Sequence, residues 1–257
     1  MSPESLRDAF ARTYSPPNGL DPIELREEYQ QFVEYRADNP NAGRYKTANV
    51  LDIPKGRARS WIDGSKPDVV RGAEIADNHS WFRTTGDTHI ALTRLVAGIF
   101  AGGSINELWT PRWSAADDVE LTSHLQTIGA GVHKITRDSS QQGDEIEPAS
   151  HPRVLGRVLV ARGAPRDHVS NYELPSYLLD DDDTGRAFVE TYVAARGVIP
   201  EDRMHIQIVE HQRSNEFYED LHTLIDRHTN GDVSLGENGV RILSDTVAQT
   251  TWLNEYK

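Results

Sequence analysis

The sequence predicts an α+β protein in which an all-α helix-turn-helix domain precedes two repeats of αββαββα order. Three observations support this prediction. Two short helical segments flank a turn in residues 44–63, a helix that ends in small residues and glycine occurs twice, and similar strand and helix patterns follow each copy. We therefore expect a flexible arm at 1–20, the helix-turn-helix domain at 21–80, and repeats at 88–165 and 184–257.

Composition excludes several classes of protein. The 257 residues contain no cysteine, which rules out disulfides, thiolate metal sites and a cysteine nucleophile. The sequence has no apolar run of about 18 residues and no apolar segment near its start. We therefore expect a cytoplasmic protein with neither a membrane span nor a signal peptide.

The charge is strongly acidic but unevenly composed. The formal net charge is −13, from 22 Asp and 18 Glu against 22 Arg and 5 Lys. This acid-rich, lysine-poor composition resembles that of cytosolic proteins from halophilic archaea, and the alternative is an ordinary acidic protein of a mesophile. The protein as a whole therefore lacks the basic surface that is typical of nucleic-acid-binding proteins, but a local basic surface is not excluded. Molar salt would also remove much of the counterion-release gain in DNA binding.

The first segments lead into that local region. Residues 1–20 fit a loose arm or a short helix, followed by a break at Pro16–Gly19. The segment from Pro22 to Tyr35 is predicted to be helical, since proline suits the first turn of a helix. A turn is expected at 38–43.

Residues 44–63 have the spacing of a helix-turn-helix. We predict a helix at 44–51, a turn at Asp52–Pro54, and a second helix at 55–63 that Gly64 closes. The side chains expected to face inward are Ala48, Val50, Ile53, Ala58, Trp61 and Ile62.

This segment is a basic island in an acidic chain. Residues 43–72 carry seven Lys or Arg and three Asp, a net charge of +4, whereas residues 1–42 sum to −4 and 73–257 to −13. Such an island is typical of a surface that contacts phosphates. The alternative is a solvated helical hairpin whose charges only aid solubility. The candidate DNA-binding residues are Arg44, Lys46, Lys55, Arg57, Arg59 and Ser60.

The second part of the chain contains an internal repeat. The segments LVAGIFAGG at 95–103 and VETYVAARG at 189–197 each form an apolar helix that ends in small residues and glycine. After the first copy we predict strands at 105–108 and 111–115, a helix at 117–128, strands at 132–137 and 145–147, and a helix at 151–162. After the second copy we predict extended segments at 198–199 and 204–209, a helix at 215–228, strands at 233–235 and 240–243, and a helix at 245–255.

This topology, with its two helix–glycine motifs, resembles the single-chain LAGLIDADG homing endonucleases over residues 88–257. The resemblance implies that the two motif helices pack side by side at a pseudo-twofold axis, where small residues permit close approach. A single chain then suffices, so we expect a monomer. The alternative is a pair of Ala/Gly-rich core helices in another α+β fold.

The motif positions depart from that family. In its active members an acidic residue precedes the last glycine of each motif, and the two acids bind Mg²⁺ between the scissile phosphates. The corresponding positions here are Gly102 before Gly103 and Arg196 before Gly197. Since neither Gly102 nor Arg196 supplies a carboxylate, the resemblance implies the fold without the nuclease chemistry, and with no metal or cofactor.

The resemblance also implies a sheet surface that lies on the DNA major groove. Arg, Lys and Gln on its strands can read bases or phosphates. The candidates are Arg112, Lys134, Arg137, Arg203 and Gln207. Further polar and aromatic residues of the same strands are Asn106, Glu107, Trp109, Trp113, His133, His205 and Arg241.

The sequence therefore predicts a sequence-specific double-stranded DNA-binding protein, acting as a transcriptional regulator on a catalytically inactive homing-endonuclease core. A similar combination of a degenerate core with a helix-turn-helix characterises bacterial sporulation regulators, although their modules have the opposite order. Two alternatives remain. One is an active Mg²⁺-dependent endonuclease with relocated acids such as Glu107 or Asp202, and the other is a protein-interaction scaffold.

Overall fold

The computed structural model describes residues 1–16, 19–115, 118–137, 143–166, 173–200, 205–209, 213–229, 231–236 and 239–256. The chain divides into two compact units. One is Ser2–Phe82, and the other is Arg83–Lys257 together with Met1. Each unit is described by itself.

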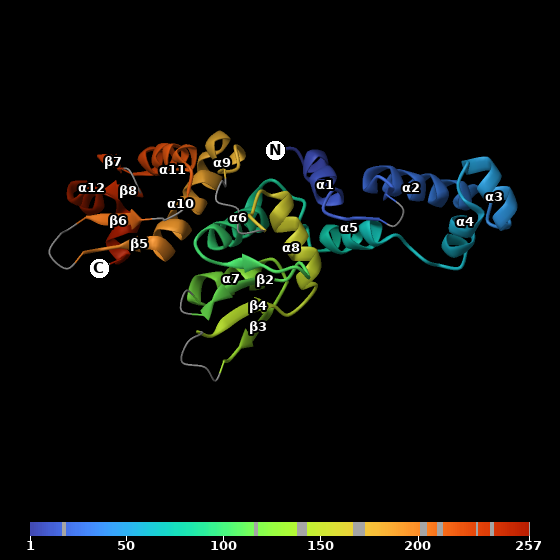
Figure 1. Ribbon diagram of the computed structural model, residues 1–257, viewed down its shortest axis with the longest axis horizontal. Helices are drawn as coiled ribbons and strands as arrows, with labels where there is room; N and C mark the ends of the chain where they lie inside the picture. Colours follow the sequence, from blue (N-terminus) through green and yellow to red (C-terminus); the bar gives the residue numbers. More distant parts are fainter. Residues whose placement is uncertain are drawn as a thin grey trace. The chain divides into compact units, whose positions relative to one another are not determined.

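The N-terminal unit is helical (Figure 1). Its helices are α1 (Pro3–Ala11), α2 (Pro22–Asp38), α3 (Arg44–Leu51), α4 (Lys55–Ile62) and α5 (Asp68–Asn78). Residues 3–11 of the predicted flexible arm form the short helix α1, which was the alternative, and this helix belongs to the compact unit. It begins at Ser2, whose hydroxyl accepts a hydrogen bond from the Ser5 amide at 3.1 Å, and it buries Leu6 and Phe10.

The turn between α3 and α4 has a clear local cause. Asp52 adopts a left-handed conformation (φ 53°), and the Ile53 amide donates back to the Ala48 carbonyl at 3.1 Å. Pro54 cannot continue the first helix and stands at the start of the next. Both predicted helices are confirmed, the second to within one residue at its end.

An aromatic cluster holds α2, α3 and α4 together. The rings of Tyr29, Phe32 and Trp61 contact one another with centroids 5.2–5.8 Å apart. Ala48 of α3, Ile53 of the turn and Ala58 of α4 complete this core, as predicted. The prediction for Val50 is wrong, since its side chain is 57% exposed. Val50 lies two positions from the buried Ala48, and residues two apart on a helix do not share a face.

The C-terminal unit is mixed α+β, so the predicted class is confirmed. Its first elements are α6 (Gly86–Phe100), β1 (Ser104–Ile105), β2 (Pro111–Ser114), α7 (Asp118–Thr127), β3 (Val132–Ile135), β4 (Glu145–Pro148) and α8 (Pro152–Ala161). Its later elements are α9 (Tyr177–Asp180), α10 (Asp182–Arg196), β5 (Gly197–Val198), β6 (Ile206–Val209), α11 (Asn215–His228), β7 (Val233–Gly236), β8 (Gly239–Ile242), α12 (Ser244–Gln249) and a 3₁₀ helix (Thr251–Tyr256). No helix in the described part of the chain is long and apolar enough to cross a membrane.

The described strands form two antiparallel four-stranded sheets with matching order. One has the order β1-β2-β4-β3 and the other β5-β6-β8-β7. In the first, Trp113 pairs with Ile146, and both side chains are buried on the helix-covered face. In the second, Ile208 and Val240 have the same role. Helices α6 and α10, each of which precedes one sheet, pack against each other (Figure 1).

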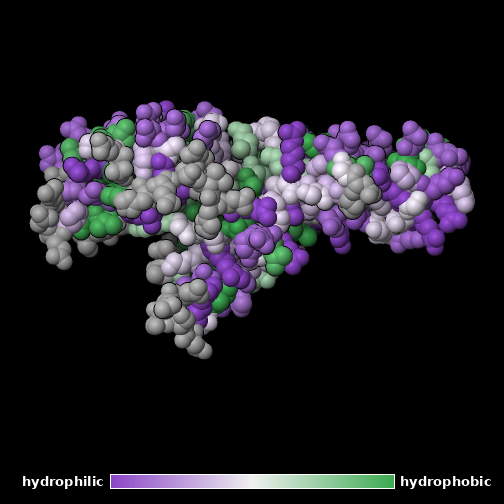
Figure 2. All heavy atoms as spheres, in the orientation of Figure 1, coloured by the Kyte–Doolittle hydropathy of each residue, from purple (hydrophilic) through white to green (hydrophobic). Residues whose placement is uncertain are grey.

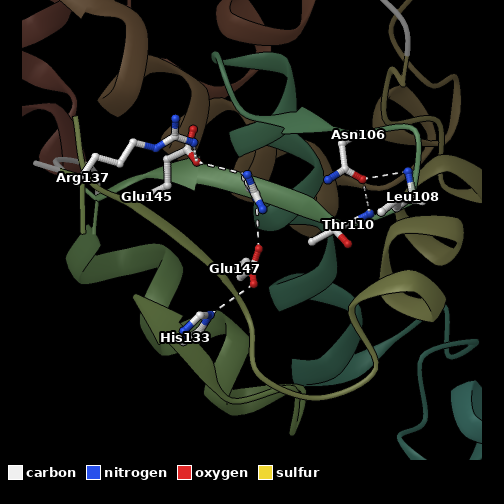
Figure 3. A network of polar contacts seen from close by, with 8 residues as sticks. Asn106, Leu108, Thr110, His133, Arg137, Glu145 and Glu147 are labelled. Atoms are coloured by element: carbon white, nitrogen blue, oxygen red, sulfur yellow. Dashed lines mark hydrogen bonds and ion pairs between the residues drawn. The ribbon is translucent and has the colours of Figure 1, made fainter. Parts of the chain in front are cut away.

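The first predicted strand of this unit is shorter than expected. It ends at Ile105 because the Asn106 carboxamide oxygen accepts hydrogen bonds from the amides of Leu108 and Thr110, at 2.9 and 3.0 Å (Figure 3). Trp109 is left-handed (φ 64°), which completes a tight loop. Residues 106–110 are therefore a loop rather than the end of a strand.

Candidate nucleic-acid interface

The exposed face of α4 gathers four of its residues. Lys55, Gly56, Arg59 and Ser60 are all exposed, at the i, i+1, i+4 and i+5 positions of one helical face. The opposite face, with Trp61 on it, is buried in the aromatic cluster. The sequence had placed three of these four residues among the DNA-binding candidates, and the structure brings them together.

Helix α3 adds two exposed cations, of which Arg44 lies near that face. Arg44 and Lys46 are exposed, and Tyr45 between them is 56% exposed. The Arg44 guanidinium carbon lies 4.9 Å from the Tyr45 ring centroid, and the Lys55 ammonium nitrogen lies 5.1 Å from it. One aromatic ring therefore holds cations of α3 and α4 close together. The surface over α2–α4 is mostly hydrophilic in the view of Figure 2.

Arg57 is not part of this face. Its guanidinium forms an ion pair with Glu28 of α2 and lies 5.9 Å from the Trp61 ring centroid. Only 18% of its side chain is exposed. Arg57 therefore fastens α4 to α2, and its expected place among the DNA contacts is corrected to a structural one.

The open face of the first sheet carries alternating charges (Figure 3). Arg112 Nε lies 3.0 Å from Glu147 Oε2, and Arg137 Nη2 lies 2.5 Å from Glu145 Oε2. His133 Nδ1 lies 3.1 Å from Glu147 Oε1. The carboxylates neutralise both arginines, so a phosphate would have to displace them. This face is a poor candidate for phosphate binding, although it does contain Arg112 and Arg137 as expected.

Two other candidates lie away from the open face of that sheet. Trp113 is 2% exposed and donates its indole N–H to the Leu95 carbonyl at 3.3 Å. Lys134 pairs across the sheet with buried Ile146, so it does not share the face of His133, but its own side chain is exposed. The expectation for Trp113 is wrong, because neighbouring residues of a strand point to opposite faces and Trp113 lies on the buried one. Arg112 and Trp113 cannot share one face, and neither can His133 and Lys134.

The second sheet has a less polar open face. Gln207 lies opposite Arg241 in the register, and Val198 and Val209 on the same face are 63% and 37% exposed. His205 precedes this strand and is buried, contrary to expectation. Arg203 and Asp202 lie outside the described residues. Gln207 and Arg241 are thus the candidates that reach this surface.

The last glycines of both motifs are explained by packing. A Cβ on Gly103 would lie 2.8 Å from Trp113 Cδ1, and a Cβ on Gly197 would lie 2.6 Å from the Val193 carbonyl oxygen. Gly102 is exposed with φ 127°, and Arg196 is half-buried at the end of α10. Close packing therefore requires glycine at positions 103 and 197. The positions before them hold no carboxylate.

A short ion-pair network links α6 to α10. Arg94 Nη2 lies 2.5 Å from Glu190 Oε2, and Arg94 Nη1 donates to the Thr191 hydroxyl at 3.1 Å. Arg186 Nε lies 2.7 Å from the other Glu190 oxygen. Arg94 and Glu190 are each only 17% exposed, so two cations hold this carboxylate at the helix contact. The acid is structural, and it lies more than one helical turn before the motif position at Arg196.

Sequence reasoning missed a buried polar chain in the C-terminal unit. Arg162 is 1% exposed and donates from Nη1 to His89 Nδ1 at 2.9 Å. An arginine can only donate, so His89 carries its proton on Nε2, which lies 3.0 Å from the Thr184 hydroxyl. Thr184 in turn donates to Asp181 at 2.5 Å. His89 thus cannot take a proton from Thr184, which argues against a threonine nucleophile here.

The pKa values of this chain follow from its burial. Burial and the nearby Arg162 guanidinium lower the pKa of His89 to about 4. Burial also lowers the pKa of Arg162 to about 10 and raises that of Tyr177, which lies beside them, to about 12. Hydrogen bonds from Thr184 lower the pKa of the Asp181 carboxyl. At neutral pH the chain therefore runs from a cation, through neutral His89 and Thr184, to an anion.

Arginines around Trp109 form a second group that the sequence analysis did not select. The guanidinium carbons of Arg157 and Arg166 lie 4.1 and 3.9 Å from the centroid of the Trp109 ring. The signal was present in the sequence, because residues 152–166 contain four Arg and no Asp or Glu. A charge count over short windows would have found it.

Compared with known proteins, the sequence matches no protein-family model and no curated protein. Any assignment of function therefore depends on the residues and contacts described above.

Proposed function

We propose that the protein is a sequence-specific double-stranded DNA-binding protein that acts as a transcriptional regulator through α3 and α4. The observation that carries this proposal is the exposed face of α4, where Lys55, Arg59 and Ser60 flank an exposed glycine. An α-helix fits the major groove, and the N-terminal residues of a recognition helix contact base edges. Lys55, Arg59 and Ser60 lie in the first turns of α4, where such contacts are made.

The residues of this face have distinct roles in the proposed complex. Arg59 presents a planar guanidinium that can bind guanine or a phosphate in bidentate fashion. Its present partner is Asp63 at 3.6 Å, and both side chains are about two-thirds exposed. A surface pair of this kind is worth little, so exchange for DNA costs little. Lys55, Arg44 and Lys46 supply phosphate contacts beside it.

For the C-terminal unit we propose a LAGLIDADG-like pseudodimer without nuclease activity, in a chain that acts as a monomer. Support comes from the matching sheet orders, the contact between α6 and α10, and the close packing at Gly103 and Gly197. The positions that would hold metal-binding acids are Gly102 and Arg196. Because carboxylates neutralise the arginines of the first sheet, we assign sequence reading to the N-terminal unit. The acidic composition favours a halophilic cytoplasm as its setting.

The test begins with a random duplex library. Full-length protein is incubated with it in about 1 M KCl, with and without Mg²⁺, and the retained and cleaved DNA are sequenced. An enriched site without cleavage supports the proposal. Mg²⁺-dependent cleavage would favour the endonuclease instead, with Glu107, exposed in the loop after β1, as one acid to examine.

A matched pair of variants then locates the contact. Lys55→Ala with Arg59→Ala removes two charges from the exposed face of α4. Lys66→Ala with Arg71→Ala removes two charges from α5 and its approach, where both cations already pair with acids. We expect the first variant to lose about 10- to 100-fold in affinity for the enriched site, since the Arg59 base contact is worth about 1–3 kcal/mol and the Lys55 phosphate contact is lost with it, and the second to lose less than about threefold. Equal losses would contradict the assignment to α4. Arg57 is left unchanged because its removal would leave the Glu28 carboxylate without its ion-pair partner.

A further inference from the structure

Helix α8 and the residues after it form a second basic island. Residues 152–166 contain Arg153, Arg157, Arg162 and Arg166 without any Asp or Glu, in a chain whose net charge is −13. Arg162 belongs to the buried polar chain. Arg153 is exposed, and Arg157 and Arg166 are half-buried. The sequence therefore places three further arginines in one short segment, one of them exposed and two half-buried.

Trp109 gathers two of them. The guanidinium carbons of Arg157 and Arg166 lie 4.1 and 3.9 Å from its ring centroid. Arg166 also donates from Nη2 to the Glu107 carbonyl at 3.3 Å. These contacts fix long side chains that would otherwise move freely, so little freedom is lost when they bind a ligand.

The loop that holds Trp109 is itself fixed against α8. Gly156 lies under it, and a Cβ at that position would be 2.0 Å from the Trp109 carbonyl oxygen. The left-handed backbone at Trp109 and the two hydrogen bonds accepted by Asn106 complete the loop. The arrangement of guanidinium groups is therefore built by the fold and not by chance contacts of surface side chains.

Two arginines of this cluster are close neighbours on α8. Arg153 and Arg157 stand four residues apart on α8, a spacing at which like charges destabilise a helix. An anion bound between them relieves that repulsion, and guanidinium groups match the oxygen geometry of phosphate.

We propose that Arg153 of α8, together with Arg157 and Arg166 on Trp109, forms a second phosphate-contacting surface that binds the backbone of double-stranded DNA. This inference rests on the proposed function. DNA is favoured over an acidic protein segment because the chain already presents a DNA-reading helix in its other unit.

The test uses the full chain and the duplex selected above. Arg153→Gln with Arg157→Gln removes two charges from the cluster, and Arg83→Gln with Arg227→Gln removes two exposed charges elsewhere in the same unit. Affinity is measured by fluorescence anisotropy over about 0.3–1 M KCl, and the thermal midpoint is recorded for each variant. We expect the cluster variant to bind at least about tenfold more weakly, and the slope of log K against log salt to fall by about 1.8, since each phosphate contact contributes about 0.9. The control variant should keep the wild-type slope, and neither thermal midpoint should fall.

A second variant, Trp109→Leu, keeps every charge but removes the ring that positions two of them. We expect a loss of several-fold in affinity with the slope nearly retained. Wild-type affinity and slope in the cluster variant, together with impaired binding by Lys55→Ala/Arg59→Ala, would overturn this inference alone. Failure of the wild-type protein to bind any duplex would overturn both proposals. Binding of an acidic peptide that Arg153→Gln/Arg157→Gln abolishes, with DNA affinity intact, would assign the surface to a protein partner and also overturn the inference.

Discussion

Gly56 provides the sharpest test of the role of α4. It stands in the first turn of the helix, and a Cβ added there meets no atom within 4 Å. Neither packing nor an unusual backbone conformation therefore requires glycine. Replacement by alanine lowers the conformational freedom of the unfolded chain, so Gly56→Ala should stabilise the N-terminal unit by about 0.5–1 kcal/mol. For a unit of this size that corresponds to a rise of about 2–8 °C in its thermal midpoint.

The same methyl group should weaken DNA binding. Gly56 lies between Lys55 and Arg59 on the exposed face, and glycine is the residue that permits the closest approach of a bound molecule to a helix backbone. We expect the affinity for the selected duplex to fall about tenfold, the equivalent of about 1.4 kcal/mol. Thermal unfolding and fluorescence anisotropy on the same preparation measure both effects.

Gly72 on α5 is the matched control. A Cβ there would lie 1.9 Å from the Tyr14 hydroxyl oxygen and 3.1 Å from Phe10 Cζ, which is buried. Gly72→Ala should therefore destabilise the same unit by about 1–3 kcal/mol through overpacking. If Gly56→Ala gained stability and bound DNA as tightly as the wild type, then the exposed face of α4 would not be the surface that enters the groove.

Three further outcomes follow from the structure. Acidification should destabilise the C-terminal unit between pH 6.5 and pH 4, because His89 stays neutral when folded (pKa about 4) while the unfolded chain takes up a proton near its ordinary pKa of 6.5. The slope is at most about 1.4 kcal/mol per pH unit, and urea unfolding at several pH values should show it flattened in His89→Gln. Gly156→Ala should cost about 1–3 kcal/mol and change the fluorescence of Trp109, since the new Cβ would meet backbone that cannot move aside. Arg57→Ala should cost about 1–3 kcal/mol in urea unfolding because it leaves the Glu28 carboxylate without its partner, whereas no change would contradict a structural role for this pair.

Local chemistry explains what the sequence predicted well. Helix α11 has the predicted limits, with Ser214 as its N-cap and an apolar stripe that becomes fully buried. Helix α3 ends where predicted because Asp52 turns the backbone and Pro54 prevents its continuation. These signals lie within a few residues of the element that they define. Helix α5 was not predicted, and its buried side chains, such as Val69 and Ala76, depend on packing against α1 and α2.

The face of a strand on which a residue lies can be predicted from neighbouring residues, but the partner of an ion pair cannot. Strand alternation alone separates Arg112 from Trp113, so the sequence could have excluded the tryptophan from the open face. The partner of Arg57 stands 29 residues earlier in the chain, and the carboxylates that neutralise Arg112 come from a strand more than 30 residues later. A sequence gives the number of cations but not their partners, which only the tertiary fold brings together.

That difference decides how the two basic regions and the sheet should be ranked as DNA surfaces. A count of cations treats Arg112 and Arg137 as equal to Arg59 and Arg153. The surroundings of these arginines differ. Glu145 and Glu147 hold Arg112 and Arg137 at 2.5–3.0 Å on a partly buried face, whereas Arg59 has a weak exposed partner and Arg153 is exposed. Binding a phosphate at the sheet breaks favourable pairs and brings the phosphate close to two carboxylates, whereas binding at α4 replaces only one weak, exposed pair. The resemblance to a homing endonuclease and the charge arrangement thus support different surfaces, and the charge arrangement favours α4 and α8 over the sheet.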